Sequence, residues 1–125
     1  MAVGSAASPA VIAPRRWGVY TVDLGQRVGS RPGKLRPCVA IQPSEFGEGL
    51  LRSTVVLPLT TRVIADAFPM RVHVPAGTAG LRAASDVMVD QVFACGNEWF
   101  RREVGELPEA LRADVSLALR EFLDL

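Results

Sequence analysis

The sequence contains two neighbouring strand-like stretches, Arg36-Pro37-Cys38-Val39-Ala40-Ile41-Gln42 and Ser53-Thr54-Val55-Val56-Leu57-Pro58-Leu59-Thr60. Both are apolar and rich in residues that favour strands. If the two strands are antiparallel neighbours, the start of the first and the end of the second meet at one rim of a sheet. Arg36 and Thr60 would then share a site. Pro58 predicts a sheet edge or a bulge near the end of the second strand.

A basic loop, residues 25–35, immediately precedes the first of these strands. It contains three glycines and Pro32, which are too many breakers for regular structure. The loop, Arg36 and Thr60 together suit a phosphodiester: the loop holds the backbone, the guanidinium meets the charged phosphate, and the hydroxyl orients it or donates a proton. Taken singly, each has an ordinary structural explanation, as a solvated strand-edge arginine, a strand-end turn or a flexible connection.

Outward from these strands, alternation and turn residues predict further strands, and the C-terminal end changes to a helical period. The expected strands are 17–23, 36–42, 53–60, 68–74 and 86–94, with a possible sixth at 101–104. After Pro108, the apolar positions Leu111, Val115, Ala118, Leu119 and Phe122 form one stripe of a helix. The sequence therefore predicts an α+β fold, a small, mostly antiparallel β-barrel with a C-terminal amphipathic helix.

Length and composition indicate one domain with a real core. We expect residues 15–125 to form that domain and residues 1–14, which carry no charged side chain, to be a disordered tail. The apolar fraction of 49% is high for a lone small domain and favours burial against a partner chain. The sequence contains no uninterrupted run of 18 apolar residues, so it predicts no membrane span. Cys38 and Cys95 are interpreted as buried thiols in a reducing cytoplasm.

Charge is unevenly distributed although the net charge is only +1. Residues 15–36 carry six cations against Asp23 alone, whereas residues 103–125 carry six acids against two arginines. The basic segment suits an anionic polymer or an acidic peptide. The sole histidine, His73, excludes a two-histidine ribonuclease, and no zinc-ligand spacing or nucleotide-binding loop is present. We therefore expect no metal and no cofactor.

In combination, these pieces resemble the MazF/PemK family of toxin–antitoxin ribonucleases. The resemblance rests on RWGVYTVDL at 16–24, VGS at 28–30, GKLRPCVAIQ at 33–42, STVVLPLTT at 53–61, GL at 80–81, VMVDQV at 87–92 and the amphipathic end at 107–125. It therefore covers the chain from about residue 15 to its end. Each piece alone is weak, but their order is specific.

The resemblance implies a barrel of the CcdB/PemK type, usually a homodimer, that acts as the toxin of a type II toxin–antitoxin system. It implies metal-independent cleavage of single-stranded RNA (mRNA) at short sequences, leaving a 2′,3′-cyclic phosphate and a 5′-hydroxyl and arresting growth in the cytoplasm. A cognate antitoxin with an acidic C-terminal tail would block the groove. In family terms, Arg36 stabilises the charged phosphorane and Thr60 positions the scissile phosphate or its attacking 2′-oxygen. The RNA-binding residues implied are Gly29, Ser30, Arg31, Lys34 and Gln91.

Two departures from the family pattern leave alternatives open. Gly18-Val19 stands where the family usually has Gly-Asp, and Arg31-Pro32 stands where it often has Glu-Gln. The missing loop acid removes a proposed proton acceptor, while an extra cation would strengthen phosphate binding. One alternative is a non-catalytic CcdB-like barrel that binds a protein target. Another is a catalytically weakened paralogue that still binds an antitoxin.

Overall fold

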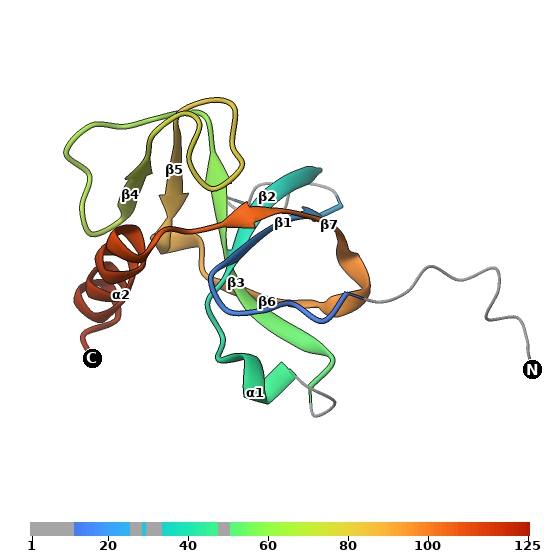
Figure 1. The fold of residues 1–125 in the computed structure, drawn as a ribbon. Coiled ribbons are helices and arrows are strands. Elements are labelled where there is room, and N and C mark those ends of the chain that lie inside the picture. The colour runs from blue at the N-terminus through green and yellow to red at the C-terminus, as the bar shows by residue number, and fades with distance from the viewer. Residues whose placement is uncertain (1–11, 26–28, 30–33, 48–50) are drawn as a thin grey trace, which may run out of the picture.

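The computed structural model describes residues 12–25, 29, 34–47 and 51–125, which form an antiparallel sheet with a C-terminal helix (Figure 1). The elements are β1 (Gly18–Asp23), β2 (Leu35–Ala40), α1 (Ser44–Gly47), β3 (Ser53–Thr60), β4 (Arg71–Val74), β5 (Ser85–Met88), η2 (Val89–Gln91), β6 (Phe93–Gly96), η3 (Asn97–Trp99), β7 (Phe100–Glu106) and α2 (Glu109–Leu123). The α+β fold and the C-terminal helix expected from the sequence are confirmed.

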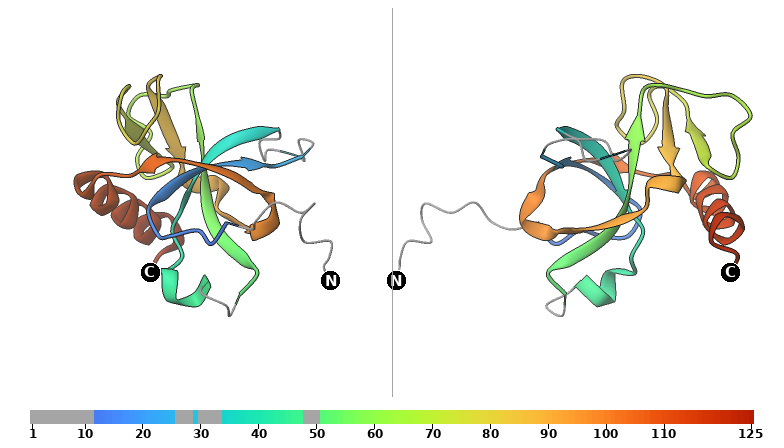
Figure 2. Two further views of the ribbon diagram at one scale, coloured as in Figure 1. Left: turned by 45° about the vertical axis from the view of Figure 1, so that its right-hand side comes forward. Right: turned by 180° about the vertical axis from the view of Figure 1, so that it is seen from behind.

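Strand β3 is the centre of the sheet, whose order is β4-β5-β3-β2-β1-β7 with β6 also paired to β3. One edge of β3 pairs with β2, and the other edge is shared by β6 and β5. The views in Figure 2 show that the sheet curls into a barrel-like body. Helix α2 packs beside β4 and η2, at the end opposite the β1–β2 hairpin.

Pro58 lies where the outer edge of β3 changes partner. Pairing with β6 ends at Val56, and pairing with β5 begins at Leu59. The Val55 carbonyl accepts the Ile41 N–H at 3.0 Å, on the β2 side. The backbone N–H and C=O groups of successive strand residues point to alternate edges of the strand. The backbone nitrogen of Pro58 therefore faces the other edge, in the gap between the segments paired with β6 and β5. The missing N–H of proline therefore costs no ladder hydrogen bond, which is the bulge-like position that the sequence indicated.

The single strand expected at 86–94 is wrong, because the chain there forms two strands separated by a turn. Thr60 pairs with Asp86 and Thr54 pairs with Cys95, so six steps along β3 match nine steps along its partner. The 3₁₀ turn η2 contains the three additional residues. Val89, in η2, is buried like the apolar residues of the strands on either side of it in the sequence. The apolar alternation of the sequence therefore continues through the turn.

Other boundaries also differ from the expected ones. β4 begins at Arg71 rather than Phe68, because the Arg71 N–H donates to the Ala67 carbonyl at 3.1 Å and closes a turn there. β7 extends over Phe100–Glu106, longer than the stretch 101–104. The short helix α1 was not predicted.

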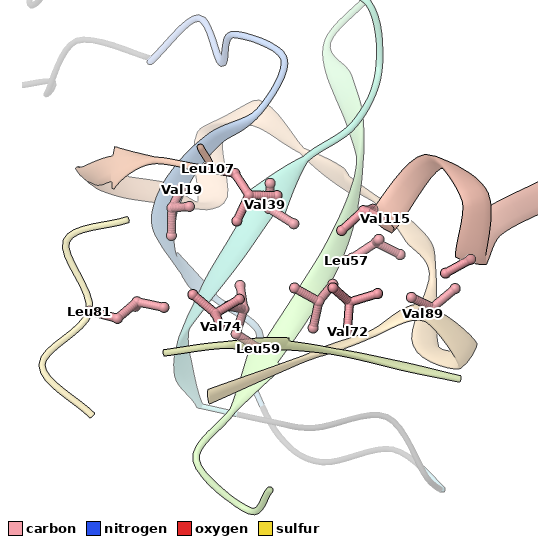
Figure 3. Close-up of a cluster of buried hydrophobic side chains, with 12 residues drawn as sticks. Val19, Val39, Leu57, Leu59, Val72, Val74, Leu81, Val89, Leu107 and Val115 are labelled. Carbon is pink, nitrogen blue, oxygen red and sulfur yellow. The ribbon is translucent and has the colours of Figure 1, made fainter. Parts of the chain in front are cut away.

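Two apolar clusters occupy the two faces of the central strands. Figure 3 shows the larger one, which joins Val19, Val39 and Leu57 of the sheet to Val115 of α2. Adjacent positions on the same strands face the second cluster, which contains Tyr20 and Val22 of β1, Cys38 and Ala40 of β2, Val56 of β3, Phe100 of β7 and Leu24. Because both faces are buried, these strands read as nearly continuous apolar runs.

The thiols and the N-terminal segment differ partly from expectation. Cys38 is fully buried, and desolvation raises the pKa of its thiol, whereas Cys95 is only partly buried; neither forms a disulfide. Ile12 packs against the second cluster and Pro14 is buried, so packing begins before residue 15. The rest of the expected tail, residues 1–11, lies outside the described residues. Among those described, no helix is long and apolar enough to span a membrane.

A buried carboxylate fixes the connection that follows β3. Asp86 of β5 is paired with Thr60 along the backbone, and its side chain is only 1% exposed. Its Oδ2 accepts the Ile64 N–H at 2.9 Å and lies 3.2 Å from Nη1 of Arg71. Its Oδ1 lies 3.1 Å from Nδ1 of His73. Asp86 therefore ties the turn after Thr60 to strand β4.

We expect Asp86→Ala to destabilise the fold by about 2–3 kcal/mol, because it leaves the Ile64 N–H and the Arg71 guanidinium without their buried acceptor. Urea unfolding followed by circular dichroism measures the change. Asp90→Ala is the matched control, because Asp90 is exposed on η2 and its loss should cost no more than about 0.5 kcal/mol. Equal effects of the two changes would contradict this structural role.

Candidate active site at the ends of β2 and β3

The antiparallel register of β2 and β3 brings Arg36 and Thr60 together. Cys38 pairs with Pro58 and Val39 with Leu57, so the same register continued by two residues places Arg36 opposite Thr60. The two residues line one pocket of about 250 Å³. The remaining lining residues are Lys34, Leu35, Pro37, Leu59, Thr61 and Ser85. The shared rim expected from the strand pattern is therefore present.

Each of the two candidate catalytic side chains comes from a well-fixed strand. Arg36 is half-buried on β2, where it pairs with Val22 of β1. Thr60 is only 8% exposed, and its Oγ1 accepts the Arg62 N–H at 3.1 Å. That bond closes a tight turn and leaves the Thr60 O–H donating to none of the described residues. The hydroxyl therefore retains a proton that it can donate into the pocket.

The sequence did not reveal what holds the turn after Thr60. Arg71 donates to the Arg62 carbonyl at 3.1 Å, in addition to its contact with Asp86. Arg71 and His73 are two apart in a strand, so they share a face. In the sequence, this spacing indicates that the two side chains could contact one acid. Which acid they contact is shown only by the β4–β5 register, in which His73 pairs with Asp86.

The expected RNA-binding residues are placed in different ways. Lys34 is exposed, lines the pocket and has a φ of 66°, and its carbonyl accepts the Leu24 N–H at 2.8 Å. Gly29 is exposed with a φ of 56°. Ser30 and Arg31 lie outside the described residues. Gln91 is in η2 at the far end of β5 from Ser85, so it does not line this pocket.

The described lining of the pocket contains cations and hydroxyls but no carboxylate and no imidazole. A guanidinium and an ammonium attract a phosphate, and the guanidinium can hold two of its oxygens at once. Among the described residues, no group of three or more histidine, cysteine or acidic side chains could hold a metal ion. The cations of the pocket suit an anionic phosphodiester.

Comparison with known proteins identifies the family. Residues 15–123 match the PemK-like, MazF-like toxins of type II toxin–antitoxin systems. The chain is 33% identical to endoribonuclease MazF6 of Mycobacterium tuberculosis over 107 residues, which cover 86% of this chain and 94% of that protein.

Solved structures agree with this assignment at the level of the fold. MazF from Deinococcus radiodurans superposes with a TM-score of 0.75 at 22% identity, covering 91% of this chain and 99% of that one. A mycobacterial endoribonuclease in complex with its cognate antitoxin superposes with a TM-score of 0.71 at 22% identity, covering 90% and 95%. The chain belongs to the PemK-like, MazF-like toxin family of type II toxin–antitoxin systems.

Proposed function

We propose that the Arg36–Thr60 pocket is the catalytic centre of a metal-independent, sequence-specific endoribonuclease that cleaves single-stranded mRNA in the cytoplasm and arrests growth. One observation carries the proposal: the β2–β3 register sets a guanidinium opposite a hydroxyl in a pocket whose described lining has no acid. The endoribonuclease names of relatives such as MazF6 support the reaction class.

In the proposed reaction, the 2′-oxygen of a ribose attacks the adjacent phosphorus while the bond to the 5′-oxygen breaks. The products are a 2′,3′-cyclic phosphate and a 5′-hydroxyl. Negative charge builds on the phosphorane oxygens, and Arg36 stabilises that charge most strongly in the transition state. The Thr60 O–H donates to a phosphate oxygen and fixes the scissile group for in-line attack.

The proton acceptor is not an acid of the β1–β2 loop. Residues 24–36 include no aspartate, glutamate or histidine. We propose that the proton of the 2′-hydroxyl passes to water or to a phosphate oxygen of the substrate, and that the departing 5′-oxygen takes up a proton from water or from that phosphate oxygen to become the 5′-hydroxyl. The reaction then depends on positioning and charge stabilisation rather than on a protein general base.

The direct test is to incubate the purified protein with a long RNA in EDTA and to map the ends of any fragments. Repeated cleavage at one short sequence, with 5′-hydroxyl and 2′,3′-cyclic phosphate ends, is the expected result. A requirement for a divalent cation would overturn the proposed chemistry. Absence of cleavage in an otherwise folded protein would favour a barrel that only binds its target.

We expect Arg36→Ala to slow RNA cleavage by about 10²–10³-fold, because it removes a charge-assisted contact to the transition state. Thr60→Val should slow cleavage more than it weakens RNA binding. Single-turnover cleavage rates and the affinity for a 2′-deoxy substitute at the cleaved position separate the two effects.

Arg120→Ala is the matched control for the charge change, because Arg120 is exposed on α2, away from the pocket. Its cleavage rate should equal that of the unaltered protein. A near-normal rate for Arg36→Ala would exclude Arg36 as the phosphorane stabiliser. An equal loss of binding and rate in Thr60→Val would make Thr60 a plain RNA contact.

We propose that an antitoxin with an acidic C-terminal tail competes with RNA for the same rim. Exposed Lys34 and half-buried Arg36 give this rim a positive charge. Lys34→Ala should weaken RNA binding and flatten the slope of log K against log salt by about one unit. It should also weaken an acidic peptide from the antitoxin, measured by fluorescence anisotropy, whereas Arg120→Ala should change neither. Unchanged peptide binding beside weakened RNA binding would place the inhibitor elsewhere.

We also propose that the toxin is a homodimer. The β3–β4 connection exposes four apolar side chains beside a pocket of about 580 Å³. They are Val63, Ile64, Phe68 and Met70, each between 44% and 55% exposed. Such a patch on a small protein indicates an interaction surface.

We expect light scattering to give about twice the 13.4 kDa mass of one chain, and Val63→Glu to shift the species toward one chain by placing a charge in the patch. Phe46→Glu is the control, because Phe46 is similarly exposed, at 49%, but lies on α1. A single-chain mass for the unaltered protein at micromolar concentration would contradict the dimer.

A further inference from the structure

A second pocket, of about 380 Å³, lies on the β1 side of the β1–β2 hairpin. Its walls come from 23–25 at the end of β1, from Phe93 and Cys95 of β6, and from Trp99 of η3. Asp23 of this pocket pairs with Leu35, which lines the Arg36–Thr60 pocket. Paired residues of antiparallel strands are about 5 Å apart, so the two pockets both border the loop end of this hairpin. Figure 1 shows β7 running alongside β1 of that hairpin.

Trp99 is 47% exposed although its two flanking anchors are buried. On one side, Asn97 is 8% exposed, and its Oδ1 accepts Thr54 Oγ1–H at 2.7 Å. The Asn97 N–H donates to the carbonyl of Arg52, the residue before β3, at 2.8 Å. On the other side, Phe100 is 5% exposed and packs edge-to-face on Tyr20 with ring centroids 5.4 Å apart. These contacts fix the backbone on both sides of Trp99. The indole is therefore presented on a rigid support rather than on a loose loop.

Arg101 joins the indole to the hairpin. Its guanidinium carbon lies 5.8 Å from the centroid of the Trp99 ring, within range of a cation–π contact. The same guanidinium donates to the Glu98 carbonyl at 2.7 Å and to Asp23 Oδ2 at 3.3 Å. Because Asp23 belongs to the hairpin, this pair links the two walls of the pocket.

We propose that Trp99 is a stacking platform for one unpaired base of the RNA whose phosphate occupies the Arg36–Thr60 pocket. This subsite rests on the proposed ribonuclease function and assigns a residue that the reaction itself does not use. Proteins bind single strands by combining cations that follow the backbone with exposed aromatic rings on which bases stack. Here Lys34 and Arg36 supply the cations on one side of the hairpin, and Trp99 supplies the ring on the other.

A base fits this pocket better than an apolar peptide side chain. The pocket volume of about 380 Å³ falls within the range of small-ligand sites. Its lining joins two aromatic rings, Phe93 and Trp99, to the carboxylate of Asp23. The Asp23 oxygens accept from the Gly25 N–H and from Arg101, and the second lone pair of each oxygen remains as an acceptor beside the stacking surface. The Asp23–Leu35 pair sets a wall of this pocket beside a wall of the phosphate pocket, which favours a ligand that has a backbone and bases.

The test uses the RNA sequence mapped in the cleavage experiment, made uncleavable by a 2′-deoxy substitution at the cut position. Fluorescence anisotropy gives its affinity for the unaltered protein and for Trp99→Ala, Trp99→Phe and Phe46→Ala. We expect Trp99→Ala to weaken binding by about tenfold, because loss of one base–aromatic stack has an effect of this size. Trp99→Phe should retain most of the affinity, because it keeps an aromatic face. Phe46→Ala should bind like the unaltered protein, since Phe46 lies on α1, away from both pockets.

A second measurement separates stacking from a structural effect of the substitution. Oligonucleotides with one abasic position each are compared with the intact strand. If Trp99 stacks on a base, one abasic position should cost the unaltered protein about tenfold in affinity and cost Trp99→Ala no further affinity. Misfolding of the variant would lower the affinity for every oligonucleotide alike and would leave that position-specific difference in place.

Cleavage and binding by Trp99→Ala at unaltered levels, or no abasic position coupled to Trp99, would overturn the subsite while the ribonuclease function stands. Weakened binding of an acidic antitoxin peptide with unchanged RNA binding would overturn it in favour of a peptide pocket. Failure of the unaltered protein to bind or cleave any RNA would instead overturn the proposed function, and the subsite with it.

Discussion

The antiparallel pairing of β2 with β3 is the interaction on which the rest of the structure depends. Its register sets Arg36 opposite Thr60 and, in the same step, assigns Val39 and Leu57 to one apolar cluster and Cys38 and Val56 to the other. A slip of one residue would exchange the two faces of a strand and break both clusters. The packing that stabilises the barrel is therefore the same constraint that assembles the candidate active site.

The outer edge of β3 adds a second constraint, because two strands share it. Pro58 marks the division between them, and η2 absorbs the difference in register. This division lets β5 reach the end of β3, where Asp86 pairs with Thr60. Since α2 packs on β4 and η2, and Arg71 of β4 contacts Asp86, a continuous path of contacts joins the C-terminal helix to the turn after Thr60.

The features that depend on local sequence pattern could be predicted. Those that depend on which strands pair with one another could not. The strand over 53–60, the helix after Pro108 and the meeting of Arg36 with Thr60 follow from apolar period and antiparallel geometry. The break within 86–94 could not be predicted, because alternation reports which face a residue occupies and not which strand it pairs with. The Asp86 contacts likewise depend on the β4–β5 register, and the exposure of Trp99 depends on two buried neighbours.

A phosphate pocket alone cannot distinguish one RNA sequence from another, because every nucleotide presents the same backbone. Selection of a sequence requires walls that contact bases, and these must be rigid if they are to hold one base relative to the scissile phosphate. The β1–β2 hairpin provides this separation of roles: its β2 side carries the cation opposite Thr60, and its β1 side joins the pocket that contains Trp99. Because Asp23 and Leu35 are paired, the backbone ladder of β1 and β2 joins the walls of the two pockets.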